Sequence, residues 1–301
     1  MNYSRAVLTS PSRERLDRRL RRDHPALSWT RLRAAIEKGQ VTVAGRPERD
    51  PAATVGATDA VVLDLNRPAA RIARSSLPLL FEDDHVLVVD KPAGLLSVPA
   101  HPGRTEDTVL ARVRDYMVHR RGAPGYVGAL HRLDRETSGA LAVALSAEAH
   151  AAGRALFSAH RFHRQYLALV RGVPTPPRGT IDAPIADAYV SGRRRMARGG
   201  DAARDAVTHY HVRERFGDRA ALVELTLDTG RQHQIRLHLQ RLGHPVLGDR
   251  VYGGDAATAA PRQMLHAWRL AFPHPLTGTA IAVDAPLPDD FARLMRRLAA
   301  R

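Results

Sequence analysis

The stretch LVELTLDTG at residues 222–230 alternates apolar and polar side chains with the two-residue period of a β-strand. Val223, Leu225 and Leu227 would share one buried face of that strand, while the residues between them would meet water. A half-buried strand needs a sheet with a core on one side. This requirement limits the folds that are open to the chain.

The residues after this strand predict a helix. Thr229 and Gln232 have the spacing of a capping box, so we expect the helix to follow the strand at once. Gly243 and Pro245 are typical of its end. The apolar residues between these limits fall on one helical face (Ile235, Leu239 and Leu242).

Strands and helices mix along the rest of the chain. Apolar runs predict buried strands at HVLVVD (85–90) and ALAVAL (140–145), and a further strand at QYLALVRG (165–172). The run SAEAHAAGRALFSAHR (146–161) predicts a helix. From this mixture we expect an α+β fold in which residues 79–301 form a large mixed, mostly antiparallel sheet.

The beginning of the chain predicts a smaller unit. RERLDRRLRR (13–22) indicates a short basic helix, and Ser28 is placed to cap a second helix over 29–38. QVTVAGRP and AVVLDL predict strands after it. We therefore expect a small α/β domain at residues 12–66, and a linker rich in Pro, Ala, Ser and Arg at 67–78.

The charge of the chain points to a polyanionic partner. The formal net charge of the 301 residues is +15, and the first fifty, with 12 basic and 6 acidic side chains, supply +6 of it. Clustered cations gain free energy when they release counterions from a phosphate backbone. A basic amphipathic helix with a broad aromatic face would favour a membrane surface instead, but the sequence contains none.

Several classes of chemistry are disfavoured by what the sequence lacks. Without cysteine there are no disulfides, thiolate zinc sites or cysteine nucleophiles. The two histidines of HQIRLH (233–238) are five residues apart, which does not suit one helical face, so we expect no metal. The patterns GxxxxGK[ST], GxGxxG and GxSxG are absent, so we expect no cofactor. With no signal-like or membrane-spanning run, we expect a cytoplasmic monomer.

What remains is a set of polar residues at predicted strand ends. Asp134 lies between Arg132 and Arg135 in HRLDRETSG. The others are Lys91 in DKPAGLL, Tyr166 in HRQYLALVRG and Arg231 in DTGRQHQIRLH. Each has a structural alternative when taken alone: a solvated ion pair, a turn, a core tyrosine, or a surface arginine in a first helical turn.

HRLDRETSG resembles the signature of the RluA-type pseudouridine synthases, whose pattern is roughly HRLDxxTSG. Four further stretches are similar to the same family in the same order. The N-terminal unit resembles the S4-type RNA-binding domain that often precedes this catalytic domain. The four stretches are EDDHVLVVDKPAGL (82–95), FHRQYLALVRG (162–172), LDTGRQHQIRLHLQRLGHPVLGDRVYG (227–253) and MLHAWRLAFPHPLTG (264–278).

The resemblance implies a role for several residues. It implies a catalytic aspartate at Asp134, a tyrosine against the uracil ring at Tyr166, and the basic partner of the aspartate at Arg231. It also implies that Arg132 fills the space left by a flipped nucleotide. Arg164 stands where relatives often carry lysine, and no catalytic role is expected for it.

Further RNA contacts are expected at both lysines and in the N-terminal unit. The other 44 basic residues are arginines, so a retained lysine hints that its compact ammonium matters locally. The expected RNA-binding residues besides Arg132 are Lys91, Ser28, Arg31 and Lys38.

The implied reaction suits one carboxylate without a cofactor. Isomerising uridine to pseudouridine involves no redox change and no group donor. Asp134 would act either as a nucleophile toward the sugar or as a base at its 2′ carbon, and the base must leave its stack first. We expect a structured RNA substrate, foremost large-subunit ribosomal RNA. The alternative substrate is transfer RNA. The alternative functions are a base-excising glycosylase and a non-catalytic RNA-binding ribosome-assembly factor.

Overall fold

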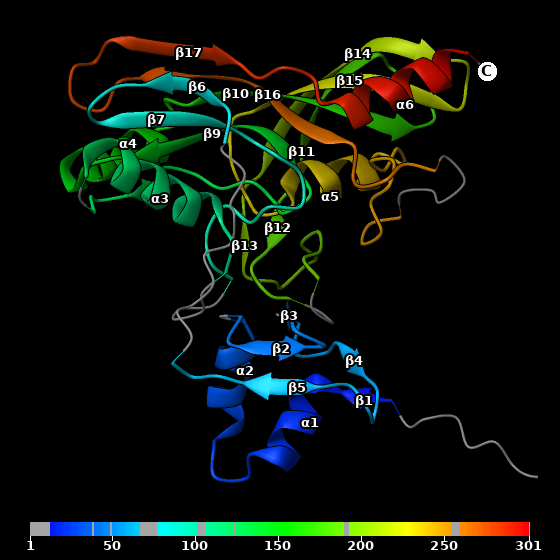
Figure 1. The fold of residues 1–301 in the computed structure, drawn as a ribbon. Helices are drawn as coiled ribbons and strands as arrows, with labels where there is room; N and C mark the ends of the chain where they lie inside the picture. The colour runs from blue at the N-terminus through cyan, green and yellow to red at the C-terminus, as the bar shows by residue number, and fades with distance from the viewer. Residues whose placement is uncertain are drawn as a thin grey trace, which may run out of the picture. The chain divides into compact units, whose positions relative to one another are not determined.

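The chain forms two compact units in the computed structural model (Figure 1). The N-terminal unit comprises described residues within 1–75 and 100–106, and the C-terminal unit comprises those within 76–99 and 107–301. Most of the expected linker, residues 67–76, lies outside the described residues. The structure describes residues 13–37, 39–48, 50–66, 77–100, 106–122, 124–189, 193–253 and 259–300.

The N-terminal unit packs two short helices against small antiparallel sheets. Strand β2 lies between β3 and β5, and β1 pairs with β4. Ser28 caps the second helix as expected, because its Oγ accepts the Arg31 amide at 3.2 Å. The elements are β1 (Glu14–Arg15), α1 (Leu16–Asp23), α2 (Trp29–Glu37), β2 (Val41–Val43), β3 (Arg46–Glu48), β4 (Thr54–Val55) and β5 (Val61–Leu63).

The C-terminal unit contains four helices and twelve strands among its described residues, and ten of these strands join one sheet. The helices are α3 (Val109–Arg121), α4 (Ala147–Ser158), α5 (Gln234–Arg241) and α6 (Asp289–Ala299). The strands are β6 (Leu79–Glu82), β7 (Val86–Lys91), β8 (Gly128–Ala129), β9 (Ser138–Ala144), β10 (His163–Arg171), β11 (Arg178–Asp182), β12 (Ile185–Ala186), β13 (Ala203–Arg204), β14 (Val207–Phe216), β15 (Ala220–Leu227), β16 (Leu265–Pro273) and β17 (Ala280–Asp284).

The sheet runs β11-β14-β15-β10-β16-β9-β7-β6, and β17 and β8 pair with β16 and β9. All its pairings are antiparallel except β9 with β16. The large mixed sheet expected from the sequence is therefore confirmed. Antiparallel pairings join the strands within each half, and the parallel contact of β9 with β16 joins the two halves side by side (Figure 1).

Alternation along β7 places the core on both faces of the sheet. Leu87 and Val89 pack in one apolar cluster with residues of α3, whereas Val86 and Val88 pack in another with Ala149 of α4. A strand buried on both faces carries apolar side chains at every position. This accounts for the continuous run HVLVVD.

The turn between β15 and α5 differs from the sequence prediction. α5 begins at Gln234, after His233 in the left-handed region at φ 60°, so Thr229 and Gln232 form no capping box. Instead, Gln234 Oε1 accepts the Thr229 hydroxyl and the Arg231 amide, each at 2.9 Å. Because the buried Gln234 side chain ties the turn down, residues 229–233 stay non-helical, and residues 230–233 line a pocket.

The parallel contact between β9 and β16 requires glycine at position 139. Gly139 has φ +110°, and a Cβ there would lie 2.2 Å from the Ala267 carbonyl oxygen. We expect Gly139→Ala to destabilise the protein by about 2–4 kcal/mol, since both backbone strain and a backbone clash oppose it. Chemical denaturation followed by tryptophan fluorescence measures this.

Gly122→Ala is the matched control. Gly122 also has positive φ, +72°, but a Cβ there would meet nothing within 4 Å. Its substitution should cost about 1 kcal/mol, from conformation alone. Equal losses in the two variants would show that the close approach of β9 to β16 is not what requires glycine.

Candidate active site

Asp134 lies in the loop between β8 and β9, and hydrogen bonds to its neighbours fix it on both sides. The Leu133 amide donates to Ser97 Oγ at 3.0 Å, and the same hydroxyl donates to the Leu133 carbonyl at 2.8 Å. On the other side, the Arg135 carbonyl accepts from Lys91 Nζ at 2.9 Å. The loop therefore presents the Asp134 carboxylate from a constrained backbone.

Lys91 is a structural residue, so the RNA contact predicted for it is wrong. Its side chain is fully buried, and Nζ donates to the carbonyls of Pro92, Leu95 and Arg135 at 3.0, 2.8 and 2.9 Å. Burial lowers the pKa of Lys91 to about 7. An ammonium has three donors, and all three are used inside the protein.

Arg236 of α5 is the cation that contacts the Asp134 carboxylate. Its Nη1 donates to Asp134 Oδ2 at 2.8 Å, while Nε and Nη2 donate to the two oxygens of Asp249 at 2.6 and 2.9 Å. Burial alone would lower the pKa of Arg236, but the hydrogen bond to Asp249 and the charge of Asp134 outweigh it and raise that pKa. Arg236 is thus a fixed charge bridging two carboxylates.

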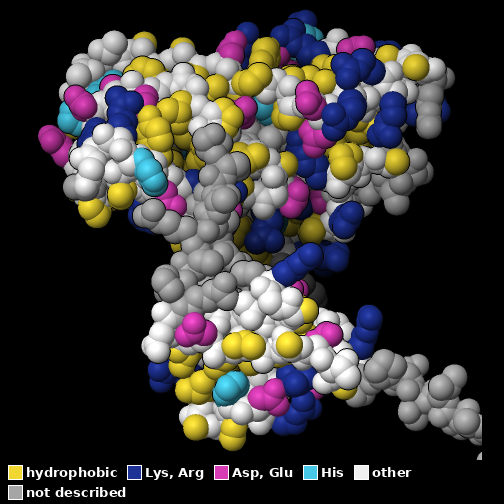
Figure 2. Space-filling model, viewed as in Figure 1, with side chains coloured by type: hydrophobic (Ala, Val, Ile, Leu, Met, Phe, Trp, Pro, Cys, Tyr) yellow, Lys and Arg dark blue, Asp and Glu magenta, His cyan; other side chains and the backbone are white. Residues whose placement is uncertain are grey.

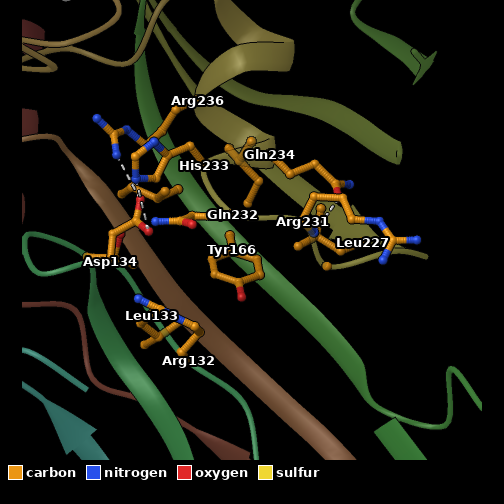
Figure 3. A pocket seen from close by; sticks show the side chains of 14 residues that line it. Arg132, Leu133, Asp134, Tyr166, Leu227, Arg231, Gln232, His233, Gln234 and Arg236 are labelled. Atoms are coloured by element: carbon orange, nitrogen blue, oxygen red, sulfur yellow. Dashed lines mark hydrogen bonds and ion pairs between the residues drawn. The ribbon is translucent and has the colours of Figure 1, made fainter. Parts of the chain in front are cut away.

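The sequence assigned this partnership to Arg231, and the structure corrects it. Arg231 lines the same pocket, but its Nε donates to the Asp205 carbonyl at 3.0 Å, and Figure 3 shows it directed away from Asp134. The helix was expected to begin just after Thr229. Because it begins at Gln234, the first helical turn presents Arg236 to the aspartate.

His233 and Tyr252 extend the surroundings of Asp134. His233 Nε2 lies 3.7 Å from Asp134 Oδ1, and its Nδ1 is hydrogen-bonded to the Tyr252 hydroxyl at 2.8 Å. A carboxylate facing Nε2 favours a proton on that nitrogen, so Nδ1 accepts from the tyrosine. The Tyr252 ring also contacts the Arg236 guanidinium, 4.8 Å from its centroid. Tyr252 therefore supports both neighbours of the carboxylate.

Sequence reasoning singled out neither Arg236 nor His233, Asp249 and Tyr252. All four lie within the stretch at 227–253 that carried the family resemblance. The motif was the available signal. It does not say which of its arginines and histidines turns toward Asp134.

Tyr166 brings an aromatic ring into the pocket of Asp134. It sits on β10 with 7% of its surface exposed (Figure 3). Burial raises the pKa of Tyr166, so its phenol stays protonated near neutral pH. Leu227, Ile235 and Leu265 add apolar walls to this cavity of about 110 Å³, which we call the Asp134 pocket. A flat base would meet a ring, apolar side chains and one carboxylate there.

The remaining predicted residues occupy different places. Arg132 is exposed and lines the Asp134 pocket. In the N-terminal unit, Ser28 uses its hydroxyl to cap α2, Arg31 is exposed, and Lys38 lies outside the described residues. RNA contacts of these residues stay predictions.

Across the part of the chain that the structure describes, no three His, Cys, Asp or Glu side chains come together as metal ligands. Among the same residues, the helices are too short or too polar to cross a membrane.

Comparisons with known proteins show the family. Residues 85–241 match the family described as RNA pseudouridylate synthase. The Ribosomal large subunit pseudouridine synthase D of Xanthomonas campestris is 40% identical, over 97% of this chain and 91% of that protein. Its namesake in Zymomonas mobilis is 38% identical, over 94% and 93%. The structure of Human RNA Pseudouridylate Synthase Domain Containing 4 is 26% identical and superimposes with a TM-score of 0.61, over 73% of this chain and 92% of that one.

The chain therefore belongs to the RNA pseudouridylate synthase family, whose members are isomerases.

The contrast between the two arginines gives a direct test. We expect Arg236→Lys to lower the single-turnover rate at saturating RNA about 100-fold, because an ammonium cannot bridge two carboxylates and Asp134 loses its alignment. Arg231→Lys is the matched control and should stay within a few-fold of wild type. Melting temperatures of both variants separate rate from folding. If both variants lose the same rate, or if Arg231→Lys loses more, Arg236 is not the basic partner of Asp134 and Arg231 is.

Proposed function

We propose that this enzyme converts specific uridines of large-subunit ribosomal RNA into pseudouridine, with Asp134 as its catalytic carboxylate. The observation that carries the proposal is the Asp134 pocket, where one carboxylate held by Arg236 lies beside the Tyr166 ring. The choice of RNA is supported by the two bacterial relatives, each named for the large ribosomal subunit and matched over nine-tenths or more of its length.

The reaction needs little beyond this arrangement. The bond between ribose carbon 1 and uracil nitrogen 1 breaks, the uracil turns, and carbon 5 bonds to the ribose. Carbon 5 then loses its hydrogen and nitrogen 1 gains one, so atoms and electrons balance. Asp134 begins the reaction as a nucleophile at the sugar or as a base at its 2′ carbon. In either route Arg236 keeps the carboxylate pointed into the pocket.

Tyr166 serves two steps of this scheme. Its ring supplies a stacking surface for the uracil, and stacking on an aromatic ring is worth about 1–3 kcal/mol. Its hydroxyl relays the proton that leaves carbon 5. Because burial raises the pKa of Tyr166, the hydroxyl works as a relay that accepts one proton while releasing another, not as a phenolate.

RNA capture belongs to other parts of the protein. Arg132, exposed beside the pocket, takes the place of the flipped uridine in its helix. The N-terminal unit, an S4-like domain over residues 12–66 joined by the linker 67–78 to the catalytic domain 79–301, adds affinity through its +6 charge. Figure 2 shows Lys and Arg side chains on the visible surface of both units. We place this enzyme in the cytoplasm, as a monomer, where ribosomal RNA is matured.

The proposal is tested by asking which RNA the enzyme modifies. Purified enzyme is incubated with large-subunit ribosomal RNA, small-subunit ribosomal RNA and transfer RNA, each unmodified. Carbodiimide-resistant uridines are then mapped. We expect one or a few sites, confined to the large-subunit RNA. Modification only of transfer RNA would overturn the assignment of the substrate, and base loss in place of isomerisation would overturn the reaction.

Asp134→Asn should bind RNA within a few-fold of wild type and form pseudouridine at less than about one percent of its rate. The amide keeps the shape of the side chain but is neither a nucleophile nor a base. Filter binding and single-turnover assays on one preparation measure both quantities. Residual turnover above that level would remove Asp134 from the chemistry.

Tyr166→Phe should bind RNA almost normally, since the stacking surface remains, but its single-turnover rate should fall about 10²–10³-fold with the loss of the proton relay. A purely structural tyrosine predicts the opposite pattern, namely a lower melting temperature with a near-normal rate per folded molecule. Both are measured on the same sample. A normal rate would leave Tyr166 with stacking alone.

A further inference from the structure

A second cleft adjoins the Asp134 pocket. It has a volume of about 610 Å³ and reaches from the pocket toward α4 and the β12–β13 hairpin. We call it the arginine cleft. It shares five residues with the pocket: Arg132, Tyr166, Leu227, Gly230 and Arg231. An RNA strand that leaves the pocket in this direction would enter the cleft directly.

The charged side chains lining the arginine cleft are all basic. Five arginines line it and no aspartate or glutamate does; the five are Arg132, Arg154, Arg164, Arg204 and Arg231. His131, also in the lining, is neutral because burial lowers its pKa to about 3. The cleft on the other side of Asp134 differs, since Glu136 and Asp249 are among its lining residues. Of the two clefts, the arginine cleft is therefore the one whose arginines are not balanced by carboxylates in the lining.

Arg164 gives this cleft a charge that the protein leaves without a counter-ion. The residue is 6% exposed, its guanidinium lies 4.8 Å from the centroid of the Phe157 ring, and Nη2 donates to the Thr229 carbonyl at 3.1 Å. Its buried Nε has no hydrogen-bond partner, and among the described residues no carboxylate forms an ion pair with it. Burying a cation in this way is costly unless an anion arrives.

Arg154 and Arg204 lie at the exposed part of the cleft. Arg154 is exposed on α4, and Arg204 is 62% exposed and pairs with Asp187 at 2.8 Å. Both guanidinium groups can therefore reach a ligand without breaking a buried contact. A guanidinium presents paired N–H groups that match the oxygens of a phosphate.

We propose that the arginine cleft is a phosphate subsite that binds the RNA backbone next to the target uridine. Arg164 contributes a buried positive charge, while Arg154 and Arg204 contact the phosphate oxygens from the rim. The subsite rests on the proposed function, because a uridine seated in the Asp134 pocket carries its own backbone into the adjoining cleft. It would orient the nucleotide as well as bind it.

The first test uses Arg154→Ala, Arg204→Ala and the double variant, with Arg215→Ala on β14 as control. Arg215 is also exposed but lines none of these clefts. We expect each rim variant to raise the Kd for substrate RNA about tenfold, and the double variant to flatten the slope of log Kd against log salt by about 0.7 per phosphate lost. Arg215→Ala should leave both the Kd and the rate at saturating RNA within threefold of wild type. Equal effects in Arg215→Ala would overturn the proposal.

The second test identifies the ligand as a phosphate. Substrate RNAs carry a single neutral methylphosphonate at successive linkages around the target uridine. At one linkage, wild-type enzyme should lose about tenfold in affinity, whereas the double variant should lose less than about twofold. If no linkage shows this coupling, the cleft holds something other than a phosphate, such as a base on Phe157, and the proposal is wrong.

These outcomes are separable from failure of the proposed function. Pseudouridine formation by the wild-type enzyme on unmodified RNA is measured in parallel. If none forms, the function is wrong, while the methylphosphonate cycle still reports whether the cleft binds a phosphate. If it forms normally and the cycle shows no coupling, only the subsite is wrong.

Discussion

The bridge that Arg236 makes between Asp134 and Asp249 is the interaction on which the rest of the site depends. Both the guanidinium and Asp249 are almost fully buried, with 6% and 1% of their side chains exposed, whereas Asp134 keeps 22%. Buried charges are costly to desolvate, so such a cluster is stable only when its geometry is good and its hydrogen bonds are satisfied. The buried Asp249 anchors the cation, and the partly exposed Asp134 carboxylate faces the pocket.

Two loops and helix α5 must therefore be placed together. Asp249 is oriented by its own turn, where Oδ1 accepts the amides of Val251 and Tyr252. The loop of Asp134 is held by its neighbours, and the parallel contact of β9 with β16 fixes where that loop ends. Arg262 adds a further tie.

The contacts of Arg262 bring the end of the chain into this support. It donates to the Glu136 carbonyl and to Ser138 Oγ, and it pairs with Asp290 of α6 at 2.7 Å. Elements separated by more than a hundred residues thus converge on the single loop that carries Asp134.

The sequence predicted the parts of this arrangement that local pattern encodes. The strands around Leu87, Leu141 and Leu225 follow from apolar runs and alternation, and Ser28 follows from capping preference. The family motifs predicted Asp134 and Tyr166 as site residues, and the fold brings both into one pocket.

What the sequence could not supply depends on contacts between distant segments. The choice of Arg236 over Arg231 rests on where α5 begins, and that is decided by the buried Gln234 side chain, not by the capping signal. A lone lysine such as Lys91 is normally exposed, and nothing local shows that three carbonyls surround it. The contacts of His233 and Tyr252 with Asp134 and Arg236 depend on the fold and are not visible in the local sequence.

The same arrangement also reconciles the carboxylate that we propose as catalytic with a polyanionic substrate. An isolated carboxylate would repel the phosphates that must approach it, and such repulsion acts within about 8–10 Å at ordinary salt. Arg236 lies 2.8 Å from Asp134 and offsets its charge, while the arginine cleft adjoins the pocket that Asp134 lines. An approaching RNA therefore meets a positively charged surface beside the pocket of this carboxylate. One set of fixed charges can thus align the proposed catalytic group and admit an RNA substrate.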